Sequence, residues 1–316
     1  MPKLLPNEPA PNAPRTKLGR LVPIVAGALA LGALAYVFHS RRAELARALE
    51  FDASVLVPMV LVAFVAHLLR AVEYDVLLVR LGVKERFGEG FLLTGAVLLL
   101  NYLPFNAGEV VRAVQLRRTR ELAYSAYVGA LAVGALMNAL VAGLFGLVAA
   151  SFVGGPHQLS LCGIFLLLAL LSALGLVVPS LIAPRGDSQR AQLRRKLRDG
   201  MALMRTRHGL LALGALCCAK FGLNALRVML SFRALGQPIS WTNAAMLGAA
   251  SVVASVVNIA PGNLGIREFV LGAAAGAAGG SPILAMAAAS LDRAVMIAYT
   301  LVAGVPGLVH WQRKLR

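Results

Sequence analysis

One pattern of eight residues, N-x-x-P-x-N-x-G, occurs twice in this chain of 316 residues. It occupies residues 101–108 and returns 157 residues later at 258–265, each time between apolar segments. Its fixed positions are Asn101, Pro104, Asn106 and Gly108 in the first copy and Asn258, Pro261, Asn263 and Gly265 in the second. Proline and glycine interrupt helices, so each copy predicts a helix break. Arg70 and Arg227 both precede the pattern by 31 residues, which indicates that a whole unit is duplicated, as in transporters built from repeats.

The composition of the chain is that of a membrane protein. Hydrophobic residues make up 59% of the sequence and charged residues 14%, with a mean hydropathy of +0.75. The apolar runs are continuous and rich in Leu, Ala, Val and Gly, whereas the strands of a membrane barrel alternate between polar and apolar residues. The sequence therefore predicts an all-α, polytopic membrane protein.

Charge, cysteine and histidine usage exclude several other classes. The net charge of +17 lies largely at the ends of apolar runs, where it orients a membrane protein, so we expect no nucleic-acid partner. The three cysteines, Cys162, Cys217 and Cys218, lie inside apolar runs and predict no disulfide framework. The five histidines are scattered without metal-ligand spacing, so we expect no metal and no cofactor.

The chain divides into a short tail and one membrane domain. Residues 1–20 are rich in proline and basic residues and predict a disordered, cytoplasmic N-terminus, whereas residues 21–316 form a single transmembrane domain. The run 21–38 is long and lacks a cleavage site, which favours an uncleaved anchor. Further spans are predicted at about 53–79, 122–151, 159–183, 209–232 and 283–309.

Two shorter apolar runs end at the repeated pattern. The first, residues 90–103, would be about 21 Å long as a helix, against a hydrocarbon core of ~30 Å. We therefore expect it to enter the membrane, break and return through residues 109–120. The run 243–260 and the segment 266–280 predict a second such re-entrant hairpin. The first repeat spans about 53–151 and the second about 209–310.

Loop charge predicts how the repeats are oriented. A basic N-terminus, a basic loop at 184–208 and a basic C-terminal tail all fall on the cytoplasmic side by the positive-inside rule. The two repeats are then inverted, and their hairpin tips meet near the midplane of the bilayer, around a polar cavity. The basic loop is expected to contact anionic lipid headgroups.

Charged residues begin each helix that follows a break. Glu109 and Arg112 follow the first break, and Arg267 and Glu268 follow the second. Asn106 and Asn263 occupy N-cap positions, and Asn106-x-x-Glu109 resembles a capping box. Within each tip the arginine and the glutamate could neutralise each other. Alternatively, the arginines and the helix N-termini form an anion site suited to a lipid phosphate.

Other polar residues lie within the predicted spans. Their spacing groups them as Lys220, Asn224 and Arg227 on one helix face, His67, Arg70 and Tyr74 on another, and Asp292, Arg293 and Tyr299 in the last span. Charges at this depth are costly and should face inward. A structural interpretation stays open for each of two groups. Arg70 and Arg227 could extend to the membrane surface. Asp292 and Arg293 could form structural pairs with partners such as Glu268 or Arg112.

The two breaks and their charged neighbours resemble a known family. Pro104-x-x-x-Gly108-Glu109 with Arg112, and Pro261-Gly-Asn-x-Gly265-x-Arg267-Glu268 with Arg293, resemble the transmembrane region of lysylphosphatidylglycerol synthases, a flippase-like family, from about residue 50 to the end. The aminoacyltransferase domain of the full-length synthases is absent, so the resemblance does not imply lysyl transfer. The first repeat also departs from the pattern, because Ala135 and Leu136 stand at the positions equivalent to Asp292 and Arg293.

The preferred function is that of a lipid translocase in a prokaryotic cytoplasmic membrane, a location that the resemblance implies. Its cavity would hold a polar or phosphate-bearing headgroup through Arg112, Arg267 and Arg227, and Glu109, Glu268 and Asp292 are candidate proton carriers. One alternative is an accessory subunit that presents a lipid to a separate cell-envelope enzyme. Another is a membrane-embedded transferase that uses intramembrane carboxylates. The sequence carries no catalytic motif and no donor-binding domain, so we do not expect an enzyme.

Overall fold

A computed structural model of the chain describes residues 52–103, 106–181, 201–202, 206–256, 263 and 265–315. The predicted N-terminal tail, the first span at 21–38 and most of the basic loop at 184–208 lie outside these residues. Three fixed positions of the repeated pattern, Pro104, Asn258 and Pro261, also lie outside them.

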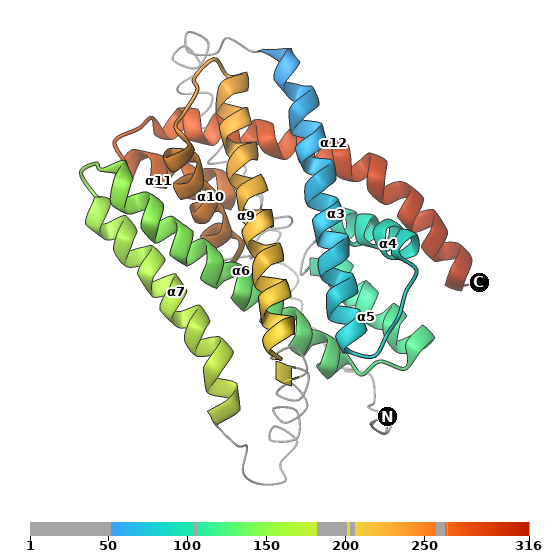
Figure 1. Cartoon of the computed structure of the whole chain (residues 1–316). Coiled ribbons are helices and arrows are strands. Elements are labelled where there is room, and N and C mark those ends of the chain that lie inside the picture. Colours follow the sequence, from blue (N-terminus) through green and yellow to red (C-terminus); the bar gives the residue numbers. More distant parts are fainter. Residues whose placement is uncertain are drawn as a thin grey trace, which may run out of the picture.

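The described residues form helices joined by short turns and no strands (Figure 1). After a short turn of 3-10 helix, η1 (Ala53–Val55), the helices are α3 (Leu56–Arg80), α4 (Phe87–Leu100), α5 (Ala107–Arg120), α6 (Tyr124–Val153), α7 (Gln158–Leu181), α9 (Arg207–Ala234), α10 (Trp241–Val256), α11 (Ile266–Ala277) and α12 (Pro282–Leu315). The predicted spans and short runs coincide with these helices to within a few residues, apart from the end of α12. Hydropathy located these helices well, because a segment in lipid must satisfy its backbone hydrogen bonds internally and a helix does so.

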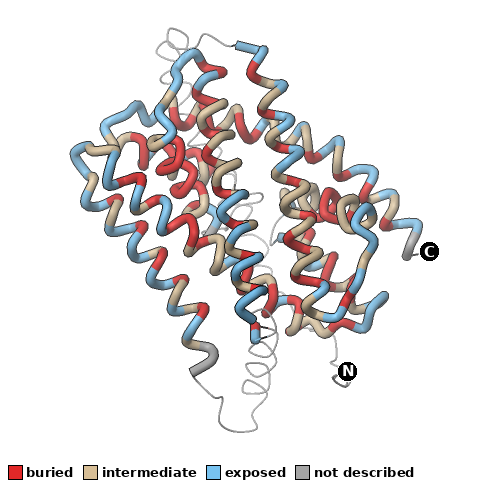
Figure 2. Tube along the Cα trace, viewed as in Figure 1, coloured by how far each residue is buried: buried red, intermediate tan, exposed pale blue. Residues whose placement is uncertain are grey.

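Within the described residues, five helices are long and apolar enough to cross a membrane: α3 with η1, α6, α7, α9 and α12. Large apolar side chains are exposed along them, as on α7, where Leu167, Leu170 and Leu171 are each more than half exposed. Figure 2 shows such exposed positions along the outward side of α7, with buried positions on the side facing α6. An apolar surface of this kind suits lipid and not water. The protein is therefore an all-α, polytopic membrane protein, as predicted.

The described helices include two sets with a similar order of long and short helices, and their origin as repeats stays a prediction. Helices α3 to α6 correspond in order to α9 to α12, and α7 lies between the two sets. Corresponding helix ends lie between 151 and 162 residues apart, and the ends of α5 and α11, Arg120 and Ala277, lie 157 residues apart. This is the same interval that separates the two copies of the repeated pattern. We call the first set unit one and the second set unit two.

The paired short helices of each unit start and finish at the same end of the molecule. At one end, Leu78, Val83, Leu116 and Leu122 form one apolar cluster that joins the end of α3, the turn into α4, the end of α5 and the start of α6. At the other end, the amide of His157 donates to the carbonyl of Ala277 at 3.3 Å, which places the end of α11 beside the turn between α6 and α7. The α4–α5 and α10–α11 pairs thus come from opposite ends. Their inverted topology and re-entrant position in a bilayer stay predictions.

Helix α12 packs against α11 of its own unit and against α4 of unit one. Its first half packs on α11, where a Cβ added to Gly272 would meet the side chain of Met286 at 2.7 Å. Its second half crosses α4 so closely that a Cβ on Gly304 would meet Leu99 Cβ at 2.6 Å. A Cβ on Gly95 of α4 would likewise meet the carbonyl oxygen of Ala303 at 2.6 Å. Small residues permit such contact between helix backbones within a membrane, and Figure 1 shows α12 extending from α11 to α4.

Candidate functional site

The two helix breaks meet at one cavity of about 320 Å³, which we call the arginine cavity. Unit one contributes Asn101, Tyr102 and Asn106 from its break, and unit two contributes Asn263. Three arginines from three different helices complete its charged lining: Arg227 of α9, Arg267 of α11 and Arg293 of α12. Ser251, Ser255, Met296 and Thr300 also line it, together with Leu98. The sequence prediction of a polar cavity at the breaks agrees with this arrangement.

The asparagines of the breaks have backbone conformations that few other residues adopt. Asn106 has a φ of 49° and Asn263 a φ of 59°, both in the left-handed region, which asparagine tolerates better than most residues. The predicted capping box is wrong, because the Asn106 side chain makes no capping hydrogen bond. Instead, Asn101 Oδ1 accepts the amide of Glu109 at 3.3 Å. The side chain at the end of α4 therefore caps the start of α5.

Glycine is required where the two arms of the first break pass each other. A Cβ on Gly108 would collide with the carbonyl oxygen of Val97 and would lie 2.6 Å from Asn101 Oδ1. In unit two the corresponding residue, Gly265, is the N-cap of α11 and has a φ of 80°. Asn263 was predicted at that N-cap position; instead, its Nδ2 donates to the carbonyl of Ala254 at 2.8 Å and so ties the break back to α10. Close packing at Gly108 and the positive φ at Gly265 therefore explain why both copies of the pattern end in glycine.

Asp292 holds two of the cavity arginines. Arg227 donates to it twice, from Nε to Oδ1 at 2.9 Å and from Nη2 to Oδ2 at 2.6 Å. Arg267 Nη1 lies 2.7 Å from the same Oδ2. The Asp292 side chain is 2% exposed, so this is a buried carboxylate with two cations. A planar guanidinium that binds both oxygens of a carboxylate is the strong form of this contact.

Arg293 pairs with the other carboxylate of unit two. Its Nε lies 2.8 Å from Glu268 Oε1, and its Nη2 donates to the carbonyl of Asn263 at 3.1 Å. The predicted structural pair between Arg293 and Glu268 is therefore present, whereas Asp292 pairs with Arg227 and Arg267 and not with Arg112. The interpretation that each tip neutralises itself is wrong for unit two, since Arg267 reaches across to α12.

The charges around the arginine cavity leave an excess of positive charge. Three arginines face two carboxylates, Asp292 and Glu268, so one positive charge is uncompensated among the charged residues of these contacts. The N-terminus of α11 begins at Ile266, next to Arg267, and its helix dipole adds positive potential. Together these groups favour a bound anion.

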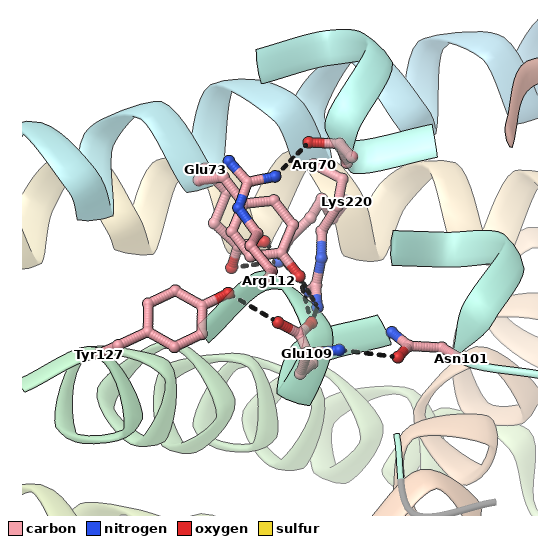
Figure 3. Close-up of polar contacts among 9 residues, drawn as sticks. Arg70, Glu73, Asn101, Glu109, Arg112, Tyr127 and Lys220 are labelled. Carbon is pink, nitrogen blue, oxygen red and sulfur yellow. Dashed lines mark hydrogen bonds and ion pairs between the residues drawn. The ribbon is translucent and has the colours of Figure 1, made fainter. Parts of the chain in front are cut away.

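A second polar cluster lies in unit one, around Glu109 (Figure 3). Tyr74 and Tyr127 both donate their hydroxyl to this carboxylate, the latter at 2.9 Å, and Arg70 Nη2 lies 3.5 Å from it. Arg112 does not contact Glu109 in this cluster. It is 1% exposed, pairs with Glu85 at 3.1 Å and lies over the ring of Tyr74, with 4.5 Å between Cζ and the ring centre. The predicted self-neutralising pair is therefore absent from unit one as well.

Glu73 connects this cluster to unit two. Its carboxylate contacts Arg70 at 3.1 Å and Lys220 of α9 at 2.7 Å, so that an ion pair joins α3 to α9. Sequence reasoning missed Glu73 and Tyr127. A signal for Glu73 was present, because it is an acidic residue within the long apolar run of α3 and such residues seldom face lipid. Tyr127 carried no comparable signal.

The predicted polar faces divide among several partners. From one face of α9, Lys220 contacts Glu73, Arg227 contacts Asp292, and Asn224 donates to the carbonyl of Gly248 at 3.0 Å. On α3, His67 Nδ1 and the hydroxyl of Tyr299 lie 2.8 Å apart. Arg70, with 36% of its side chain exposed, forms ion pairs, as does Arg227, so contacts within the protein account for both.

Of the ten predicted substrate residues, Arg227, Arg267 and Arg293 line the arginine cavity, and Asp292, Glu268 and Asn224 lie directly behind it through contacts with lining residues. Arg70, Glu109, Arg112 and Lys220 belong to the cluster of unit one and its surroundings. Over the described part of the chain, no three His, Cys, Asp or Glu side chains are grouped as metal ligands, and the three cysteines are free.

Fold and site together define a polytopic helical membrane protein with a positively charged cavity that is backed by two buried carboxylates. The chain belongs to the family described as the lysylphosphatidylglycerol synthase TM region, whose model matches residues 23–304. Searches among curated proteins and among solved structures found no match. Membership confirms the resemblance drawn from the two breaks, and it is consistent with a lipid-related role in a membrane.

Proposed function

We propose that this protein is a lipid translocase that moves a lipid with an anionic headgroup across the membrane. The observation that carries the proposal is the arginine cavity, where the breaks of both units meet three arginines and two carboxylates. A cavity with one uncompensated positive charge, inside a protein with an apolar outer surface, suits a headgroup that is negatively charged and attached to acyl chains.

The size of the cavity indicates which part of the lipid enters it. Binding sites for drug-sized molecules occupy roughly 300–1,000 Å³, and the arginine cavity, at about 320 Å³, lies at the low end. It can hold a headgroup, while the acyl chains stay in the bilayer against the exposed apolar side chains. Arg227 and Arg267 can bind the phosphate without releasing Asp292, because each guanidinium has five donors.

Movement across the membrane would use the opposed directions of the two helix pairs. The α4–α5 pair approaches the cavity from one end of the molecule and the α10–α11 pair from the other, so a shift of either pair would open the cavity to one side. In this proposal the units are inverted repeats, both termini are cytoplasmic, and the membrane is a prokaryotic cytoplasmic membrane. The mechanism contains no chemical step, and the protein is not an enzyme.

Transfer of a labelled lipid in proteoliposomes tests the proposal. Purified protein is reconstituted with phosphatidylglycerol carrying a fluorophore on one acyl chain, and dithionite quenching reports the fraction that reaches the outer leaflet. Arg267→Gln removes one cavity cation while Asp292 stays bound to Arg227. Because a hydrogen bond to a charged group contributes about 1.5–3 kcal/mol, transfer should slow about ten- to hundredfold. Arg233→Gln, at an exposed position of α9, is the matched control and should transfer like the wild type.

The outcomes separate the candidate functions. Equal transfer by wild type and Arg267→Gln would refute a role for the cavity. If the wild type transfers no lipid but copurifies with one that mass spectrometry identifies, an accessory role beside a cell-envelope enzyme replaces the proposal. A chemically changed lipid after incubation with lipid donors would instead indicate a transferase.

A further inference from the structure

The two carboxylates behind the arginine cavity are held very differently. Both oxygens of Asp292 are bound by arginines, at distances between 2.6 and 2.9 Å. Glu268 is bound through Oε1 alone, by Arg293 at 2.8 Å. Its Oε2 is buried and has no hydrogen-bond partner within the described parts of the chain. A buried polar atom without a partner is costly, and native structures contain few of them.

This difference decides where a proton can bind. A proton arriving at Glu268 Oε2 occupies a free position and displaces no hydrogen bond. A proton arriving at Asp292 would have to displace Arg227 or Arg267 from a buried contact, which is strongly unfavourable. In unit one, Glu109 already accepts hydrogen bonds from Tyr74 and Tyr127 through different oxygens. Among the three carboxylates considered as proton carriers, the structure therefore favours Glu268.

Protonation of Glu268 would change the charge of the cavity. Arg293 lines the cavity, and Glu268 is its acidic partner. With Glu268 ionised, three arginines and two carboxylates leave one positive charge; with Glu268 neutral, they leave two. The additional charge attracts an anion more strongly.

We propose that Glu268 takes up a proton when an anionic headgroup binds in the arginine cavity, so that anion and proton move together. This inference rests on the translocase function and names its coupling ion. Coupling of this kind is reciprocal: the proton raises the affinity for the anion, and the anion raises the affinity for the proton. An anion with one negative charge and the proton together add no net charge, so the loaded cavity has the same net charge as the empty one.

The charged and titratable groups around Glu268 are consistent with this assignment. Arg293 on α12 contacts Glu268 directly, and Arg267 on α11, Asp292 on α12 and Tyr102 after α4 lie near Arg293. Arg227 on α9 reaches this group through Asp292. Helix α10 carries no titratable side chain between Trp241 and Val256. Among them, Asp292 is a second carboxylate, and arginines already bind both of its oxygens.

The experiment measures binding of dibutyryl-phosphatidylglycerol to the purified full-length protein in detergent by titration calorimetry. This soluble lipid is a phosphodiester that keeps a single negative charge at neutral and mildly acidic pH, so a dependence on pH reports on the protein. Affinity should rise as the pH falls, by up to about tenfold per pH unit where uptake is complete. Titrations in buffers with different ionisation enthalpies should show uptake of up to about one proton per anion.

Glu268→Gln keeps the volume of the side chain but holds no negative charge. It should bind the lipid at about pH 8 as tightly as the wild type binds it at low pH, with no dependence on pH and no proton uptake. Glu121→Gln, at an exposed position after α5, is the control and should behave like the wild type. Elution as a single species and a cooperative melting transition show that each variant is folded, and proton uptake by the wild type tests the inference without any variant.

Several results would overturn the inference. Binding that is independent of pH in the wild type, with no proton uptake, would refute proton coupling while leaving the anion cavity intact. A Glu268→Gln variant with the pH dependence of the wild type would place the proton elsewhere. Absence of binding at every pH would refute the proposed anion site itself, and the coupling with it.

Discussion

Replacement of Asp292 by asparagine should destabilise the protein more than any other single change in the arginine cavity. Asp292 accepts three hydrogen bonds from Arg227 and Arg267 at 2.6 to 2.9 Å, and its side chain is 2% exposed. Asparagine has nearly the same shape but no charge, and its amide nitrogen would face a guanidinium. Two buried arginines would then lose their acidic partner.

The magnitude follows from the number of buried partners that are lost. Removing one member of a buried ion pair costs about 3–5 kcal/mol, because the remaining charge is left uncompensated. Arg267→Gln leaves Asp292 bound to Arg227 through both oxygens, so it should cost about 1.5–3 kcal/mol, the contribution of one hydrogen bond to a charged group. The double variant should cost less than the sum of the two, because the two changes remove the same contact.

Reversible unfolding in mixed micelles of dodecyl sulfate and a mild detergent measures these differences in the free energy of unfolding. Glu121→Gln, which makes the same change from a carboxylate to an amide at an exposed position, provides the baseline. Asp292 is not the shared partner of the two arginines if Asp292→Asn costs no more unfolding free energy than Arg267→Gln. The same conclusion follows if the costs of the two single changes add in the double variant.

Two further predictions concern the contacts between the units. Gly304→Ala should destabilise the protein by about 1–3 kcal/mol in the same assay, because its Cβ would meet Leu99 Cβ at 2.6 Å. Gly222→Ala, where nothing lies within 4 Å of the new atom, should not destabilise, and equal costs would contradict the close crossing. Glu73→Gln breaks the ion pairs with both Arg70 and Lys220, so it should cost more unfolding free energy than Lys220→Gln, which breaks one of them. The reverse order would contradict the role of Glu73 as the shared partner of both cations.

Sequence alone could predict the helices and the places where they break. Hydropathy located them because each apolar run must hydrogen-bond within itself in lipid, and the repeated pattern marked both breaks. It also identified three of the arginines that line the cavity, since a charge within an apolar run must face inward. The short runs could be matched to α4 and α10 because their lengths fall below the thickness of a bilayer.

The pairing of side chains could not be predicted in the same way. Arg112 lies one turn into α5, as expected for a cavity residue, but its guanidinium reaches Glu85 before α4 and the ring of Tyr74. The capping box failed because Asn106 adopts a left-handed conformation, whereas a capping side chain requires an extended one. Both outcomes depend on how two helices pack against each other in space. The periodicity of residues along a single helix gives no information about that packing.

The course of α12 has a consequence for any motion of the units. Its first half, with Asp292 and Arg293, is paired with α11 of its own unit two, and its second half packs closely against α4 of unit one at Gly304. If one unit moves relative to the other, α12 has to bend between these contacts. Thr300 lies in that interval, and its hydroxyl bonds the carbonyls of Met296 and Ile297, a contact that weakens and bends helices.

Pro306, further along α12, also removes a backbone hydrogen bond from the helix. Because Thr300 lines the arginine cavity, bending at this point would change the shape of the cavity wall directly. The boundary between the moving parts of the molecule then lies in the middle of α12. It differs from the boundary between unit one and unit two in the sequence.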